Sequence, residues 1–213
     1  MRYPAALLCC LSLLATAGCA APDRALFDGR DLAGWEFVTV PALDIRAVCQ
    51  VRPDGVIAVT GKPSGFLATA GSHQDFRLHA EWRWPGKPGN GGVLVHISSG
   101  PKDREWPLSL QIQLKNGNAG DLLPMAGASF AEPLTSPTGA VTLIKARTAP
   151  DSEKPAGEWN SCDITCRGDT IEVVINGVRQ NSITRVNPAA GRVGFQLEGV
   201  PFELRQVRLT PLD

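Results

Sequence analysis

The sequence predicts an all-β fold, built as a sandwich of two antiparallel sheets. Apolar and polar residues alternate with a period of two in five separate runs, residues 77–84, 93–97, 109–115, 162–167 and 193–198. Such alternation is typical of strands that bury one face. The pairs Gly168-Asp169 and Asn176-Gly177 bound a further alternating run, and both pairs favour tight turns between antiparallel strands. The 22 glycines and 17 prolines also suit a fold rich in turns.

The five runs, taken in order, direct their apolar residues toward one face, which we expect to pack in the core. In the second run, alternation points Val93, Val95 and Ile97 inward, and Leu94 and His96 outward. One large residue from each run is expected between the two sheets: Trp82, Val95, Ile112, Ile164 and Phe195.

Residues 26–213 are expected to form a single domain, because strand-like runs recur along them without a linker. Two stretches rich in glycine and proline, residues 117–139 and 149–157, are predicted to be loops. A loop as long as the first one is either a functional lid or a mobile insert. The 21 basic and 21 acidic residues balance each other and form no basic block, which argues against a nucleic-acid partner.

The first 19 residues have the features of a signal peptide. Arg2 precedes an apolar core at residues 5–15, which is too short to span a bilayer. The segment ends in Thr16-Ala17-Gly18-Cys19, which is similar to a bacterial lipobox with Thr16 where leucine is usual. The alternative is ordinary cleavage after Ala17 or Ala20. We expect export in either case; with lipid on Cys19, residues 20–25 would tether the domain to the periplasmic face of the cell envelope.

Three cysteines remain after such processing. Cys162 and Cys166 lie four residues apart on one predicted strand, roughly 13 Å from each other, so they cannot form a disulfide. One bridge from Cys49 is conceivable, but buried free thiols are the expected state.

Polar side chains occupy the outward faces of the same runs. If these strands are neighbours in one sheet, their outward residues form one continuous surface. Amide, carboxylate, guanidinium and imidazole groups suit the hydroxyls of a sugar, although a solvated sheet face would also be polar. The predicted surface comprises Glu81, Arg83, His96, Gln111, Gln113, Lys115 and Gln196. We expect it to line one cleft, with the 117–139 loop along its rim. His96 is the best single candidate for contact with a sugar; the alternative is a histidine at the rim of a sheet whose hydrogen bonds are satisfied within the protein.

The motifs of common cofactor and nucleophile chemistry are absent from the sequence. It contains no Gly-x-Ser-x-Gly, phosphate loop, dinucleotide fingerprint or His-Glu-x-x-His. No cofactor is therefore predicted, although loop oxygens from scattered positions can still assemble a site for a divalent cation.

Several motifs resemble, in order, those of the 3-keto-disaccharide hydrolase domain family, long catalogued as a domain of unknown function. The first is Leu26-Phe27-Asp28-Gly29-Arg30-Asp31-Leu32-Ala33-Gly34-Trp35, and the others fall within residues 75–83, 89–94, 109–114 with 120–121, 157–160, 175–178, 191–196 and 201–209. The resemblance spans residues 26–210. It implies a concanavalin-A-like jelly-roll sandwich that acts on oxidised sugars or at least binds glycans.

The resemblance implies cleavage of 3-keto-glycosides. In such a sugar the ketone at C3 acidifies the hydrogen on C2, which permits elimination of the group on C1. Such a site needs a base, a proton donor for the leaving group and an electrophile for the ketone oxygen. We assign these roles to Glu81, His96 and Lys115 respectively. Substrate contacts are expected from Arg83, Gln111, Gln113, Asp121 and Gln196. Gln111 stands where the family often has glutamate, so the alternative is a lectin-like module that binds sugar without proton transfer.

Overall fold

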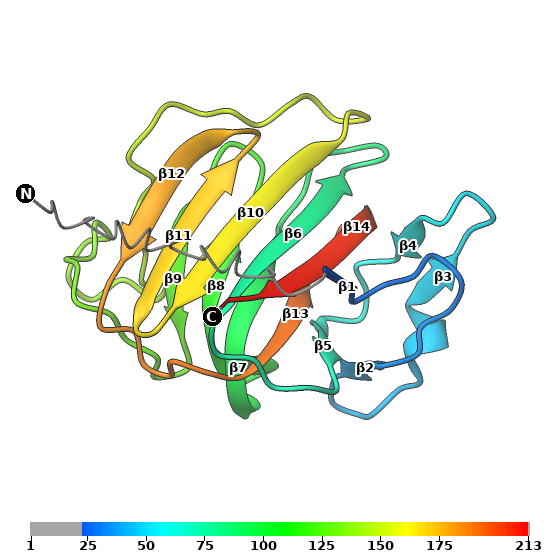
Figure 1. Ribbon diagram of the computed structural model, residues 1–213, viewed down its shortest axis with the longest axis horizontal. Helices are drawn as coiled ribbons and strands as arrows, with labels where there is room; N and C mark the ends of the chain where they lie inside the picture. The colour runs from blue at the N-terminus through cyan, green and yellow to red at the C-terminus, as the bar shows by residue number, and fades with distance from the viewer. Residues whose placement is uncertain (1–22, 213) are drawn as a thin grey trace, which may run out of the picture.

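Two antiparallel sheets pack face to face in the computed structural model, which describes residues 23–212 (Figure 1). In strand order, sheet A consists of β12 (Val178–Ile183), β11 (Thr170–Ile175), β10 (Asn160–Arg167), β6 (Phe76–Arg83), β14 (Phe202–Pro211), β4 (Ile57–Val59) and β3 (Cys49–Val51), with β1 (Arg24–Ala25) paired to β14. Sheet B consists of β2 (Trp35–Val38), β5 (Gly65–Thr69), β13 (Arg192–Leu197), β7 (Gly91–Asp103), β8 (Trp106–Gln113) and β9 (Leu122–Met125). The one helical element among the described residues is the 3₁₀ turn η1 (Ile45–Ala47). The predicted all-β sandwich is confirmed.

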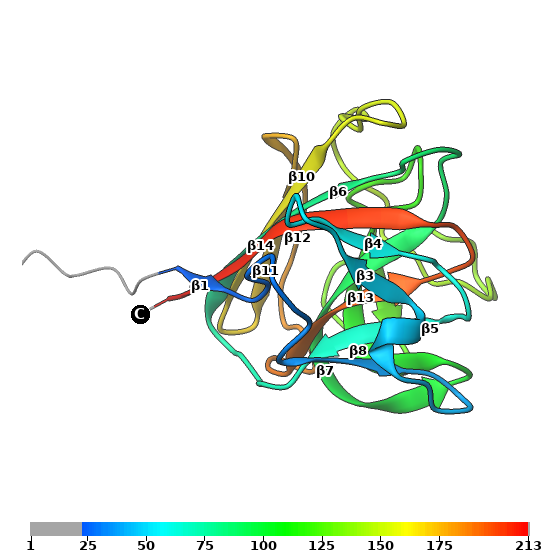
Figure 2. The same ribbon diagram turned by 90° about the vertical axis from the view of Figure 1, so that its right-hand side faces the viewer.

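The core lies between the two layers that Figure 2 shows edge-on. All five residues chosen from the alternating runs are buried there, none more than 1 % exposed. The core is continuous along both sheets, because the inward faces of β6, β10 and β11 meet those of β7, β8 and β13. Period-two patterning is therefore enough to identify which residues fill a sandwich of this kind.

Tight turns join the strands where the sequence predicts them. Gly168-Asp169 connects β10 to β11, with Arg167 paired to Thr170, and Asn176-Gly177 connects β11 to β12. Asn176 and Gly177 both adopt positive φ, 49° and 79°. These are the backbone angles of a two-residue turn that follows the natural twist of a hairpin.

Strand β7 departs from regular alternation at His96. Its backbone has φ 55°, and the pairing register of β7 with both β8 and β13 shifts at this point. The irregularity exchanges the directions in which the side chains of His96 and Ile97 point. Ile97 joins Leu94 in a separate apolar cluster, while the ring of His96 packs edge-on against core residue Phe76. The expectation that Ile97 points inward and His96 outward is therefore wrong, because a bulge breaks the period of two.

Two segments expected to be irregular contain strands. β9 lies inside the predicted 117–139 loop, and β1 lies at the end of the predicted 20–25 tether, where it pairs with β14. Pro124 argues against a strand here, because proline cannot donate a backbone hydrogen bond. β9 is an edge strand, however, and an edge strand tolerates such a residue. Residues 149–157 lack strand or helix, as predicted.

The three cysteines of the domain are free and buried. Burial raises the pKa of the Cys49 thiol to about 12 and also raises the pKa values of Cys162 and Cys166. These thiols therefore stay protonated at neutral pH and act as small apolar groups in the core.

No helix within residues 23–212 is long and apolar enough to cross a membrane. The predicted signal peptide and Cys19 lie outside the described residues.

Candidate functional site

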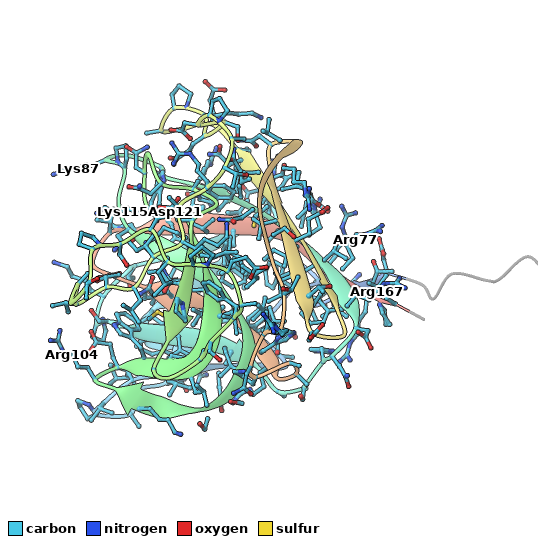
Figure 3. All side chains as sticks on the ribbon, turned by 90° about the vertical axis from the view of Figure 1, so that its left-hand side faces the viewer. Arg77, Lys87, Arg104, Lys115, Asp121 and Arg167 are labelled. Atoms are coloured by element: carbon cyan, nitrogen blue, oxygen red, sulfur yellow. The ribbon has the colours of Figure 1, made fainter. Side chains whose placement is uncertain are left out.

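The polar residues singled out in the sequence fall into three separate places: the outer face of sheet A, the outer face of sheet B and, for His96, the interior. Glu81 and Arg83 lie on β6 in sheet A, whereas Gln111, Gln113 and Gln196 lie on β8 and β13 in sheet B. The outward faces of the two sheets point away from each other, so the prediction of one continuous polar surface is wrong. Figure 3 shows this separation: Arg77 and Arg167 stand on the sheet A side, and Lys115, Asp121 and Arg104 on the sheet B side.

Glu81 belongs to a chain of ion pairs on the outer face of sheet A. Its Oε2 accepts a hydrogen bond from Arg205 Nε at 2.5 Å, and its Oε1 lies 3.9 Å from His79 Nε2. His79 Nδ1 lies 2.7 Å from Asp163 Oδ1. These cross-strand pairs connect β6 to β10 and β14, so the carboxylate of Glu81 is occupied by a structural partner.

Arg83 belongs to the same network and lies two residues after Glu81 on the same face of β6. Its Nε donates to Glu203 Oε2 at 2.5 Å, and Arg52 Nη1 donates to Glu203 Oε1 at 2.7 Å. The guanidinium groups of Arg83 and Arg205 both lie over the ring of Trp159, at 4.6 and 4.1 Å from its centroid. Cation–π contacts and paired carboxylates occupy the guanidinium of Arg83, and Arg83 does not line the pocket described below, in which the predicted glutamines meet.

His96 is fully buried and does not line a cleft. Its Nδ1 lies 3.0 Å from the carbonyl oxygen of Pro188, to which it can donate, and its Nε2 has no hydrogen-bond partner among the described residues. Burial lowers the pKa of the imidazole, chiefly by desolvation, so the ring is neutral at neutral pH. The structure thus separates His96 from both Glu81 and Lys115.

A pocket of about 510 Å³ lies on the outer face of sheet B, and we call it the sheet B pocket. Five of the residues predicted from the sequence for substrate contact or catalysis line it together: Gln111, Gln113, Lys115, Asp121 and Gln196. The polar side of its wall consists of Asn90, Gln111, Gln113, Lys115, Asn118, Asp121, Gln196 and Glu198.

Three glutamine side chains meet at the centre of the pocket wall. Gln111 Nε2 donates to Gln113 Oε1 at 3.2 Å and to Gln196 Oε1 at 2.9 Å. All three are at least nine-tenths buried, and Gln111 Oε1 has no partner among the described residues. Gly92 lies between Gln113 and Gln196 in the strand register, and a Cβ there would come within 2.7 Å of the Gln111 amide. A glycine at this position gives the three amides room to meet.

Strand order places Glu198 and Lys115 at the same end of sheet B. Both β13 and β8 run antiparallel to β7, which lies between them, so the ends of β13 and β8 lie at one edge of the sheet. Lys115 follows β8, and Glu198 follows β13 and accepts a hydrogen bond from Asn90 Nδ2 at 2.6 Å. Glu198 lies two residues after Gln196 in the alternating run 193–198, so the period of two puts both on one face, but only the fold brings Glu198 to Lys115.

The pKa of Glu198 is raised above its ordinary value. Partial burial is the largest cause and the charge of Glu105 the next, while Lys115 and the hydrogen bond from Asn90 oppose the rise. A carboxyl group with a raised pKa in a cleft is a candidate for proton transfer near neutral pH.

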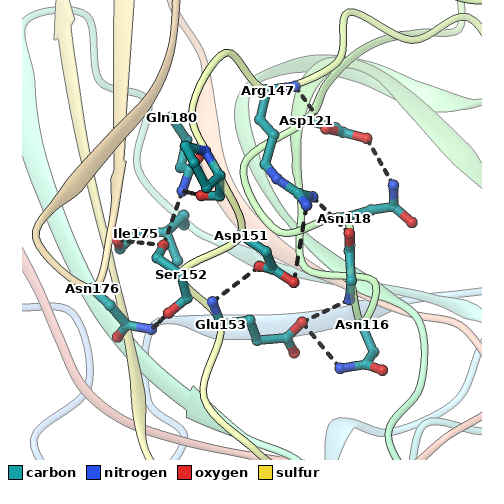
Figure 4. A network of polar contacts seen from close by, with 12 residues as sticks. Asn116, Asn118, Asp121, Arg147, Asp151, Ser152, Glu153, Ile175, Asn176 and Gln180 are labelled. Carbon is teal, nitrogen blue, oxygen red and sulfur yellow. Dashed lines mark hydrogen bonds and ion pairs between the residues drawn. The ribbon is translucent and has the colours of Figure 1, made fainter.

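A network of hydrogen bonds fixes the loops beside the pocket (Figure 4). Asp121 Oδ1 accepts from the backbone N–H of Arg147 at 2.8 Å, and its Oδ2 accepts from Asn118 Nδ2 at 3.3 Å. Glu153 Oε2 accepts from Asn116 Nδ2 and from the Gly117 N–H at 3.1 and 2.8 Å. These contacts join the 115–121 turns to the 147–153 loop, so Asp121 both lines and braces the pocket.

The other side of the pocket is apolar. It is formed by Trp106, Leu123, Pro124, Met125, Val141, Leu143 and Ile144, with Ala126, Gly127 and Thr142 between them and Arg104 at one end. Val141 and Leu143 belong to residues 135–144, which we call the flap. Backbone hydrogen bonds fix the two ends of the flap. Thr135 N–H donates to the Ile144 carbonyl at 2.7 Å, and Lys145 exchanges backbone hydrogen bonds with Leu122 of β9. The predicted 117–139 loop lines the pocket with Asn118, Asp121 and residues 123–127, and the flap adds residues 141–144, which lie just beyond the predicted bounds.

A second hollow of about 820 Å³ lies at the opposite edge of the molecule. It is lined by β3, β4 and neighbouring residues such as Leu32, Val48 and Pro201. This hollow is larger, but its charged and amide side chains, those of Asp31, Arg46 and Gln50, are all exposed. The sheet B pocket has three buried amides beside a carboxylate and an amine, and it is therefore the better candidate site.

Within residues 23–212, no cluster of three or more histidine, cysteine, aspartate or glutamate side chains gathers in a way that could hold a metal ion.

Solved structures of similar fold include several carbohydrate-related proteins. A provisionally assigned glycosyl hydrolase from Parabacteroides distasonis is 24% identical over 90% of this chain and 94% of its own, with a TM-score of 0.67. LamAcat from Zobellia galactanivorans is 10% identical over 91% of this chain and 98% of its own, with a TM-score of 0.59. The carbohydrate-binding module CBM66 from Bacillus subtilis is 10% identical over 83% and 95%, with a TM-score of 0.58. At these identities the likeness concerns the fold alone.

No curated protein sequence matches the chain. Residues 22–210, nearly all of the domain, match the 3-keto-alpha-glucoside-1,2-lyase-like domain. The resemblance identified from the sequence motifs is thereby confirmed, and the chain belongs to the family of 3-keto-alpha-glucoside-1,2-lyase-like domains.

Proposed function

We propose that this protein cleaves 3-keto-glycosides by elimination in the sheet B pocket. The observation that supports this best is the joint presence of Glu198, Lys115 and three buried glutamines around one pocket, in a chain of this family. Amides suit the hydroxyls of a sugar, and the carboxyl and ammonium groups suit proton transfer and charge stabilisation.

The chemistry follows from the ketone at C3, which makes the hydrogen on C2 acidic. A base removes this hydrogen as a proton, and the electron pair forms an enolate with its negative charge on the ketone oxygen. The enolate collapses, a double bond forms between C1 and C2, and the bond from C1 to the glycosidic oxygen breaks. The leaving oxygen takes up a proton. The products are a free alcohol and an unsaturated keto sugar, to which water can add.

Glu198 is the proposed base. Its raised pKa makes the carboxylate a stronger base than an ordinary glutamate, which suits it to removing the proton from C2. After the proton has moved, the same carboxylic acid can return it to the leaving oxygen. Base and acid thus reside in one group, and neither Glu81 nor His96 takes part.

Lys115 keeps the role predicted for it, which is to stabilise the negative charge on the ketone oxygen. Its ammonium group is exposed at the mouth of the pocket and close enough to Glu198 to affect the pKa of that carboxyl group. Gln111, Gln113 and Gln196 would hold the sugar hydroxyls, with Gln111 Oε1 as an acceptor that has no partner within the described protein.

The decisive experiment compares the wild-type protein with the Glu198→Gln variant on a 3-keto-disaccharide and its unoxidised parent. We expect the wild type to cleave only the keto form. The variant should lose at least about a hundredfold in kcat, the usual scale for removal of a general base, while binding changes little because the amide keeps the shape. If the wild type cleaves neither the 3-keto-disaccharide nor the 3-keto form of methyl glucoside, the proposal is contradicted.

The second candidate is a sugar-binding module without catalysis. It is favoured by the amide of Gln111, which lies at the centre of the pocket wall and cannot accept a proton as a base would. In that case Glu198→Gln should weaken binding of keto and unoxidised sugars alike, and neither protein should release product.

A further inference from the structure

The wall of the sheet B pocket is divided into a polar part and an apolar part. The division follows β8, whose outward residues Gln113 and Gln111 belong to the polar part. Next to Gln111 on β9 lies Leu123, and Met125 lies opposite Ser109 further along. Trp106, at the start of β8, also belongs to the apolar part of the wall. In Figure 3, Lys115 and Asp121 mark the polar end and Arg104 the opposite end.

The flap contributes apolar side chains that lack a partner within the described protein core. Val141 is 94% exposed and Leu143 is 42% exposed, and both line the pocket. Leu134 is similarly exposed, at 38%, but does not line it. Single exposed aliphatic residues are ordinary on a surface. Here, however, two of them line the same pocket as Met125 and Trp106.

We infer that this apolar part binds the leaving group of the substrate, and that this group is an aromatic or long aliphatic aglycone. The inference rests on the proposed function, which places the keto sugar on the glutamines. An apolar aglycone would bury the side chains of Trp106, Met125 and Leu143, and each buried methylene group contributes favourably. The exposed Arg104 can stack its guanidinium plane on an aromatic ring at the same end.

A sugar as leaving group fits this part of the wall less well. Its hydroxyls would lie against Met125, Val141 and Leu143, which offer no hydrogen-bonding group. Polar groups that lose water without gaining a partner weaken binding. The chemistry of the wall therefore distinguishes glycosides of apolar alcohols from disaccharides.

The test uses the purified protein and the 3-keto forms of methyl, 2-naphthylethyl and glucosyl glucosides. The first two release aliphatic alcohols of similar acidity, so they differ in apolar area rather than in leaving-group chemistry, and we call the second the naphthyl substrate. We expect kcat/KM for the naphthyl substrate to exceed that for the methyl substrate by at least about tenfold, the scale of burying a few carbon atoms. Leu143→Ser should reduce the naphthyl value about fivefold to tenfold and change the methyl value less than about twofold. The matched control Leu134→Ser should change neither value.

The outcomes separate the inference from the proposed function. Cleavage of the methyl substrate without preference for the naphthyl one, or a preference for the disaccharide, would overturn the inference and leave the function standing. If no keto-glycoside is cleaved, the function fails, and calorimetry with unoxidised naphthyl and methyl glucosides then decides the apolar site. Tighter binding of naphthyl glucoside, lost in Leu143→Ser but kept in Leu134→Ser, would support the site alone; equal binding of the two would refute it.

Discussion

The carboxyl group of Glu198 gives the proposed reaction a defined pH dependence. Its pKa is raised above the ordinary 4.5, mainly by burial and then by Glu105. A base acts in its ionised form, so activity should fall as pH decreases through this raised pKa. We expect the acidic limb of kcat/KM, measured with a 3-keto-glycoside, to lie above pH 4.5. Replacing the repelling charge by Glu105→Gln should move this limb to lower pH; an unchanged limb would mean that another group is the base.

Glu81 provides the contrast to Glu198 at the scale of a single residue. It pairs with Arg205 on the outer face of sheet A, away from the sheet B pocket. We expect Glu81→Gln to retain kcat/KM within about twofold, and to lose no more than about 1 kcal/mol of unfolding free energy, as is usual for a partly exposed ion pair. Turnover assays and urea unfolding measure the two effects. Loss of turnover with an intact fold would restore Glu81 as a catalytic candidate.

At the scale of the element, strand β7 owes its irregular course to the bulge at His96. The buried ring packs against Phe76, and Nδ1 is satisfied by Pro188. We expect His96→Ala to cost about 2–4 kcal/mol of unfolding free energy at pH 7.5, through the cavity and the lost hydrogen bond. The folded fraction should keep its kcat/KM. The control His79→Ala removes a part-buried contact with Asp163 on the outer face of sheet A and should cost less than about 1 kcal/mol.

The effect of His96→Ala should also depend on pH. Burial lowers the pKa of His96 in the folded protein below that in the unfolded chain. The stability contributed by the neutral ring is therefore present above about pH 6.5 and is lost as pH falls below it. The difference in unfolding free energy between wild type and variant should narrow between pH 7.5 and 5.5. A difference that stays constant would show that the buried ring does not titrate in this range.

The turn at Asn176 shows what an element owes to its surroundings. The sequence identifies the Asn-Gly turn, but not that the Asn176 side chain donates to Ser152 and Asn160 and accepts from the Ser161 N–H. Through these bonds a hairpin turn also holds the loop that braces the sheet B pocket.

At the scale of the whole molecule, we propose that the domain is exported and held to the cell envelope by lipid on Cys19. The signal-like first 19 residues and the lipobox-like sequence support this proposal. Cys19→Ala should then move the protein from the detergent-extracted membrane fraction to the soluble exported fraction, because one covalent lipid is the anchor. Immunoblotting of the two fractions measures the shift. Unchanged fractionation would indicate that Thr16 prevents lipidation and that an ordinary signal peptide operates.

The sequence by itself determined the alternating strands that supply most of the core, and the two tight turns that bound β11. Alternation places Trp82 and Ile112 inside because side-chain direction in a strand is a local property with a period of two. Glycine and asparagine mark turns because they tolerate positive φ. The order of the family motifs likewise identifies the domain, since it requires no knowledge of which strands pair.

The tertiary structure alone decided which of these strands share a surface. β6 and β8 alternate in the same way, yet one enters sheet A and the other sheet B, so Glu81 and Gln111 face opposite sides. The bulge at His96 likewise reverses a face without a local signal in the pattern. Strand pairing depends on contacts between residues distant in sequence, and that is why Glu198 meets Lys115 in the sheet B pocket while Glu81 and His96 do not.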